Sequence, residues 1–587
     1  VAEAEPWWRA YTAVASGPSG VQNLKTVAAG AVRGAGYHAG WYGFWFLDDQ
    51  ERMGNAARQW ELAGQAGVKR LLYYDLGEVG DYAGFFGADG KMRHNGWSIP
   101  FWKSDEPLTA RWFGLQAFMQ NASWSPWPTA KDYGLPPFTA PGGSAADDLY
   151  RVLSRRDLDG KWAFDHFSNA RVTDEIAERS GLAGISQRQQ GKADVQGKSG
   201  WVTSRLIHVD FGNPQLLDYQ CREIARLIPK LRPDGIHADN FGDLHIARAD
   251  VAGFGLWSVH GFREFLKRHF SQAELAGMGI ADVDTFDPPQ ARLRGGFDIA
   301  AYVREKQMEP KGNKWMQLRS PKWTADPIWL RYLVYKVETG LGYHRRFYEA
   351  AKQAAAQAGV DCAVFGNLVP GAPGAALMKG FCDIAHFEWS ATRGWWGLRE
   401  MALPPKGRVG YVARLGAAIS DAGYCWPSLY VPKNLSGAGH ENLHKVLAFD
   451  CLANRGLLDF GHWFLDGYSP GTPESAGFVN RFIRRQAARL SRREYLADVA
   501  VVHSAWSEVA SLTVFHPVTE MFIDEYSGWC QFLGDTHRQW DVVLAEDLSA
   551  ARLARFPIVV LPSVMVLTDA QAAELSKYVE AGGRLVA

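Results

Sequence analysis

The sequence predicts a (β/α)8 barrel, a TIM barrel of the α/β class with large loop insertions, followed by a smaller flavodoxin-like α/β domain. Eight short apolar runs follow one another along residues 1–490, and most alternate with helical stretches, which is the pattern of parallel βα units. No glycine-rich phosphate loop follows the first run, so an open doubly wound sheet is the weaker interpretation. A second strand–helix pattern begins near residue 495.

The first half of the predicted barrel contains four apolar runs. A helical stretch over about 49–65 follows the first run, and a helix from Pro214 to about Leu231 follows the third, since proline suits a first helical turn. A helix near 258–270 follows the fourth run. The four predicted strands are Tyr37–Leu47, Lys69–Leu76, Arg205–Phe211 and Asp234–Asp239.

The second half continues the same alternation. A long helical stretch over about 327–358 precedes the fifth run, and helices near 441–453 and 475–490 follow the seventh and eighth. The four predicted strands are Asp361–Gly366, Cys382–Trp389, Tyr424–Val431 and Leu457–Leu465. Eight such units in order close most naturally into a barrel.

Two insertions interrupt this pattern, at about 77–204 and 271–324. The first is rich in Gly, Pro, Trp and Phe. Loops after barrel strands lie over the active-site face, so we expect this insertion to shape a pocket.

The segment 495–587 predicts a small α/β domain with flavodoxin-like topology. It ends in a strand–turn–helix–Gly-Gly–strand pattern, in which Thr568 or Asp569 would cap the helix. The chain stops inside the last predicted strand, which is what a truncated sequence would show.

Composition narrows the classes of partner. The chain has 63 basic and 63 acidic residues and no basic stripe, which disfavours nucleic acid. No apolar run reaches 18 residues, so no membrane span is predicted. The 24 Trp residues suit either sugar stacking or aromatic core packing. The six Cys residues lack zinc-ligand or redox spacing and are expected to be buried free thiols. The Val1 start leaves the compartment open, including a secreted or periplasmic one.

Acidic side chains stand at the ends of many predicted strands, where barrel enzymes place their catalytic groups. Glycoside hydrolysis needs two carboxyl groups that flank the scissile bond, and it requires no metal or other cofactor. Asp239 follows an apolar strand directly and is the leading catalytic candidate, with a helix N-cap as its alternative role. Glu388 is the second catalytic candidate, and a salt bridge with Arg393 or Arg399 is its alternative.

Further strand-end residues are candidates for holding a carbohydrate substrate. The two acids among them, Asp75 and Asp210, are catalytic reserves that could instead orient their neighbours through buried hydrogen bonds. The histidines could equally be satisfied core residues, and the tryptophans could equally be packing residues. The set is Trp41, Asp75, His208, Asp210, His237, Asn240, Asn367, His386, His462 and Trp463.

Other chemistries have weaker support. No Gly-x-Ser-x-Gly elbow is present. No His-x-His spacing supports a metal site, although His208, Asp210 and His237 could form one in a metal-dependent hydrolase.

Two segments resemble known families. The stretch VVLAEDLSAARLARFPIVVLPSVMVLTDAQAAELSKYVEAGGRLVA resembles the β-galactosidase trimerisation domain, which implies a flavodoxin-like fold without catalytic duty and a homo-oligomer. The motif PDGIHADNFG resembles the fourth-strand signature of the α-galactosidase clan and related glycosyl hydrolases. That resemblance implies Asp239 as nucleophile and, by strand order only, Glu388 as acid/base, where the clan usually has Asp.

The sequence therefore predicts a retaining, exo-acting glycoside hydrolase, with an α-linked substrate implied by the clan resemblance alone. An inverting or β-specific glycosidase on the same rim and a non-catalytic carbohydrate-binding barrel are the alternatives. Barrels that precede a trimerisation-type domain usually carry catalytic glutamates on strands four and seven, and this chain has neither.

Overall fold

The computed structural model describes most of the chain, with gaps. The described residues are 6–9, 14–15, 36–39, 61, 69–96, 98–124, 129–143, 152–158, 160, 164–167, 172–186, 200–239, 241, 253–284, 296–306, 326–368, 374–390, 408–430, 438–458, 473–490, 495–514 and 519–587.

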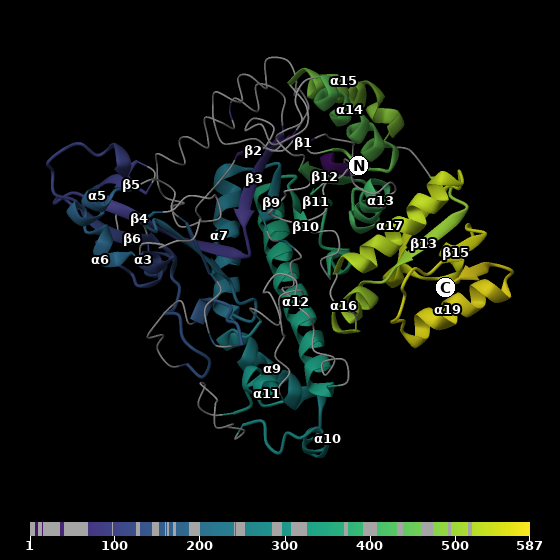
Figure 1. Cartoon of the computed structure of the whole chain (residues 1–587), viewed down its shortest axis with the longest axis horizontal. Helices are drawn as coiled ribbons and strands as arrows, with labels where there is room; N and C mark the ends of the chain where they lie inside the picture. The colour runs from purple at the N-terminus through teal and green to yellow at the C-terminus, as the bar shows by residue number, and fades with distance from the viewer. Residues whose placement is uncertain are drawn as a thin grey trace.

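A seven-stranded parallel sheet forms the barrel wall (Figure 1). A parallel bridge from Cys425 to Gly456 continues it, and the Leu457 N–H donates to the Cys425 carbonyl at 2.8 Å. In order across the sheet, the strands are β1 (Val14–Ala15), β2 (Gly36–Ala39), β3 (Lys69–Asp75), β9 (Gly235–Asp239), β10 (Ala363–Leu368), β11 (Ile384–Ser390) and β12 (Cys425–Tyr430).

One predicted barrel strand was wrong. The run Arg205–Phe211 contributes β8 (Ser204–His208), which pairs antiparallel with β4 (Glu78–Phe86) and β7 (Phe164–Phe167) in a separate sheet. The first barrel strand is instead β1, which the sequence analysis did not predict. A short apolar run fits either kind of sheet, because its pattern does not specify its partner. The barrel loses one predicted strand before Asp239 and gains β1, so Asp239 remains on the fourth barrel strand.

The first insertion and β8 together form this separate antiparallel sheet, beside the barrel in Figure 1. Strand β4 lies between β8 and β5 (Met92–Asn95), and β6 (Thr109–Gly114) also pairs with β4. The insertion buries its own apolar cluster, including Phe85 and Trp102. Within its described residues, the insertion's helices are α3 (Leu115–Met119), α5 (Asp174–Arg179) and α6 (Leu182–Ile185).

Two helices beside the barrel begin and end where local signals predict. Asn213 caps α7 (Pro214–Leu231) by accepting hydrogen bonds from the next turn, and Gly359 ends α12 (Pro327–Ala358) with a φ of 60°. The other helices in the part of the barrel that the structure describes are α9 (Leu256–His269), α10 (Gln272–Gly277), α11 (Ile299–Glu305), α13 (Arg408–Ile419), α14 (Ala438–Ala453) and α15 (Pro473–Leu490).

Strand alternation divides the core. Leu71 and Phe365 belong to one apolar cluster, whereas Leu72 and Val364, their neighbours in the chain, pack in another cluster with α7 residues such as Ile224. Side chains on the two faces of the barrel wall therefore meet different partners.

The C-terminal sheet is parallel, with the order β14 (Trp540–Leu544), β13 (Val499–His503), β15 (Ile558–Val560) and β16 (Arg584–Val586). Flavodoxin-like sheets begin with this order. Thr568 caps α19 (Asp569–Glu580) through a capping box. The remaining helices are α16 (Ala505–Val514), α17 (Thr519–Asp535) and α18 (Ala550–Leu553).

The C-terminal sheet packs on the barrel through α13. The Arg414 guanidinium lies 3.9 Å from the centroid of the Trp540 ring, and the Tyr411 hydroxyl is 2.7 Å from His503 Nδ1. All six Cys residues are free thiols, and five of them are buried, as predicted. No helix within the described ranges is long and apolar enough to cross a membrane.

Candidate active site

The candidate site lies at the carboxyl ends of β9 and β10. Ile236 and Ala238 are fully buried on one face of β9, so His237 and Asp239 occupy the other. Gly366 on β10 permits close approach of the two strands, because a Cβ there would lie 2.1 Å from the Ala238 carbonyl oxygen.

Asn367 joins three side chains at this end of the barrel. Its Nδ2 donates to Asp239 Oδ1 at 2.6 Å. Its Oδ1 lies 2.8 Å from His237 Nε2 and 2.6 Å from His386 Nδ1. An amide oxygen only accepts hydrogen bonds, so both imidazole nitrogens must carry a proton in this arrangement.

Aromatic packing holds the two imidazoles. The His237 ring stacks on Phe365 with centroids 5.1 Å apart, and it meets His386 edge-on at 4.6 Å. Phe365 in turn packs edge-on against Trp426 at 4.9 Å. Both histidines are buried, so their rings have little freedom to rotate.

Asp75 stands beside Asp239. The two residues are register partners on β3 and β9, and the Leu76 N–H donates to the Asp239 carbonyl at 3.2 Å. Neighbouring strands lie about 4.8 Å apart, so two half-buried acids occupy adjacent positions on one rim.

Two predicted residues, His208 and Asp210, come from β8 and the turn after it. The Val209 N–H donates to the Gly77 carbonyl at 3.0 Å, which brings the end of β8 beside the end of β3. The buried Asp210 carboxylate accepts from the Gly212 N–H at 3.1 Å and from the N–H and hydroxyl of Ser258. This geometry fits the hydrogen-bonding alternative for Asp210.

Several predicted residues lie outside what the structure describes. The Glu388 backbone belongs to β11, two residues beyond His386, but its side chain is outside the described set. Trp41, Asn240, His462 and Trp463 are outside the described residues. Their predicted roles stay predictions.

The sequence analysis missed two buried polar residues on α7. The Tyr74 hydroxyl donates to Glu223 Oε2 at 2.8 Å, and burial raises the pKa of Glu223 to about 8. Gln220 Nε2 donates to the Leu76 carbonyl at 3.2 Å, next to Asp75. Gln220 and Glu223 are three residues apart on the buried face of an amphipathic helix, which is the signal that could have revealed them.

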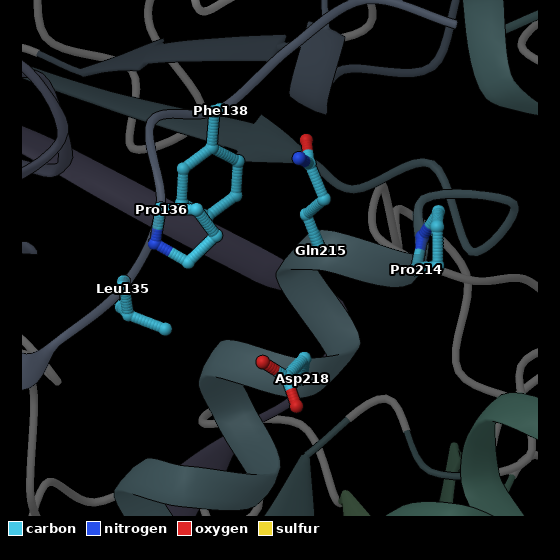
Figure 2. A pocket seen from close by; sticks show the side chains of 6 residues that line it. All are labelled: Leu135, Pro136, Phe138, Pro214, Gln215 and Asp218. Atoms are coloured by element: carbon cyan, nitrogen blue, oxygen red, sulfur yellow. The ribbon is translucent and has the colours of Figure 1, made fainter. Parts of the chain in front are cut away.

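An apolar cavity of about 160 Å³ lies at the start of α7. Figure 2 shows Pro136 and Phe138 near the helical turn that carries Pro214 and Gln215. None of the Asn367 network lines this cavity. Within the described part of the chain, no three His, Cys, Asp or Glu side chains are grouped as metal ligands.

Comparisons with solved structures identify the fold. The chain is similar to the β-galactosidase from Bacillus circulans sp. alkalophilus, with a TM-score of 0.55 and 11% identity over 98% of this chain and 71% of that one. It is also similar to the β-galactosidase from Halorubrum lacusprofundi, with a TM-score of 0.53 and 13% identity over 98% and 72%. A GH42 β-galactosidase from G. stearothermophilus gives 0.53 and 11% over 99% and 72%.

The predicted barrel fold is therefore confirmed as one that these glycoside hydrolases share. No family model matches the chain, and no curated protein matches it in sequence.

Proposed function

We propose that the chain is a glycoside hydrolase whose active site is the rim around Asp239. The observation that carries this proposal is the hydrogen bond from Asn367 to the Asp239 carboxylate, with Asp75 in register beside it. A half-buried, oriented carboxylate next to a second acid supplies the two carboxyl groups that glycoside hydrolysis requires.

In this proposal Asp239 is the nucleophile of a retaining, exo-acting enzyme and Glu388 is the general acid/base. Asp75 is the alternative partner, because it is the acid in register with Asp239. The chain lacks the glutamates on strands four and seven that the trimerisation-domain resemblance would imply. The roles proposed for Asp239 and Glu388 therefore do not follow from that resemblance.

A β-linked substrate now has better support than the α-linked one. The α-linkage rested only on the resemblance of PDGIHADNFG to the α-galactosidase clan, whereas the three similar structures are β-galactosidases. Assembly of several copies through residues 495–587 is part of the proposal and rests on resemblance.

The test is hydrolysis of a panel of α- and β-linked aryl glycosides by the wild type and by Asp239→Asn. Asparagine keeps an acceptor for Asn367 but removes the carboxylate, so we expect kcat to fall by about 10³-fold or more. Glu388→Gln and Asp75→Asn distinguish the two acid/base candidates, and exposed Asp218→Asn is the matched control. Unchanged activity in Asp239→Asn would refute the proposed nucleophile.

A further inference from the structure

When the Asp239 carboxyl group is ionised, the hydrogen bonds of Asn367 permit only one orientation of its amide. If the amide were reversed, its oxygen would face the Asp239 carboxylate oxygen at 2.6 Å, and its NH2 group would face both imidazoles. Two acceptors at that distance repel each other unless Asp239 carries a proton. An ionised Asp239 therefore fixes the orientation of the Asn367 amide, and the amide oxygen fixes which nitrogen of each imidazole carries the proton.

We propose that Asn367 is the positioning residue of this rim: it aims the Asp239 carboxylate and selects the proton-bearing nitrogen of both histidines. His237 then carries its proton on Nε2 and His386 on Nδ1. The role assigned to Asp239 rests on the proposed function, whereas the hydrogen-bond order does not.

A substrate-binding role fits Asn367 less well. Its Oδ1 already accepts two hydrogen bonds, which fills both lone pairs, and its Nδ2 donates to Asp239. The titratable groups that the structure describes around it are Asp75 on β3, His237 and Asp239 on β9, and His386 on β11.

The first test compares the pH profiles of kcat/KM for the wild type and Asn367→Asp. The variant places a second carboxyl group against Asp239. Two carboxyl groups in such close contact cannot both be ionised easily, so they share a proton and one pKa is raised. We expect the acid limb to move up by about one pH unit or more. Asn454→Asp, at a buried asparagine bonded to Arg414, is the control and should leave the limb in place.

Asn367→Ala separates positioning from substrate binding. Without the hydrogen bond from Asn367, the Asp239 carboxylate is no longer held in one orientation, and we expect kcat to fall by about 10–100-fold with little change in KM. A raised KM with unchanged kcat, or an unmoved acid limb in Asn367→Asp, would overturn the proposal.

A second measurement needs no turnover. Imidazole ¹⁵N shifts, assigned with His237→Gln and His386→Gln, should show a proton on Nε2 of His237 and on Nδ1 of His386. The opposite tautomers would overturn the proposal. If the expected tautomers are found but the wild type cleaves no glycoside, the proposed function fails and the positioning role of Asn367 stands.

Discussion

Glu223 makes the stability of the fold depend on pH in a direction that a substitution can test. This fully buried carboxyl group on α7 accepts a hydrogen bond from Tyr74 on the barrel wall. Burial raises its pKa from 4.5 to about 8, because the interior disfavours the charged form. Glu223→Gln keeps an acceptor for Tyr74 and removes the titration.

The folded chain keeps a proton on Glu223 between pH 4.5 and about 8, whereas the unfolded chain releases it. The free energy of unfolding therefore falls as the pH rises through this window, by up to about 1.4 kcal/mol per pH unit. The full contribution of the protonated Glu223 to the free energy of unfolding is present below pH 4.5, and it is about 5 kcal/mol at most.

Urea unfolding of the wild type and Glu223→Gln from pH 5 to 9 measures this effect. We expect the wild type to lose stability relative to the variant up to about pH 8, with a constant difference above it. Exposed Glu338→Gln on α12 is the control and should show no such trend. A pH-independent difference between the wild type and Glu223→Gln would refute the reasoning.

Two further substitutions test the barrel wall by thermal unfolding. Gly366→Ala would push a Cβ against the Ala238 carbonyl and should cost about 2 kcal/mol, whereas Gly342→Ala in α12 meets open space and should be neutral or stabilising. An unchanged melting temperature in Gly366→Ala would contradict the close approach of β9 and β10. Asp383→Asn removes the 2.9 Å ion pair with the partly exposed Lys352 and should cost about 1.5 kcal/mol, and a loss below about 0.5 kcal/mol would contradict this.

Local signals predicted helices α7 and α12 well. The predicted bounds of α7 and α12 agree with the structure, because a capping Asn213 or Asp326, a proline at the first turn and Gly359 act within a few residues of the ends they define. The strand that ends at Asp239 was also predicted, since an apolar run followed by an acid is a local pattern.

The sequence by itself determined the fold class, the long helices and the acid at the end of the fourth strand. Only the tertiary structure decided that Arg205–Phe211 leaves the barrel and that Val14–Ala15 enters it, because strand pairing depends on residues far apart in the chain. The joining of Asn367 to Asp239, 128 residues away, has the same origin. Residues on different strands meet only after the sheet has set their register, and no local pattern encodes that register.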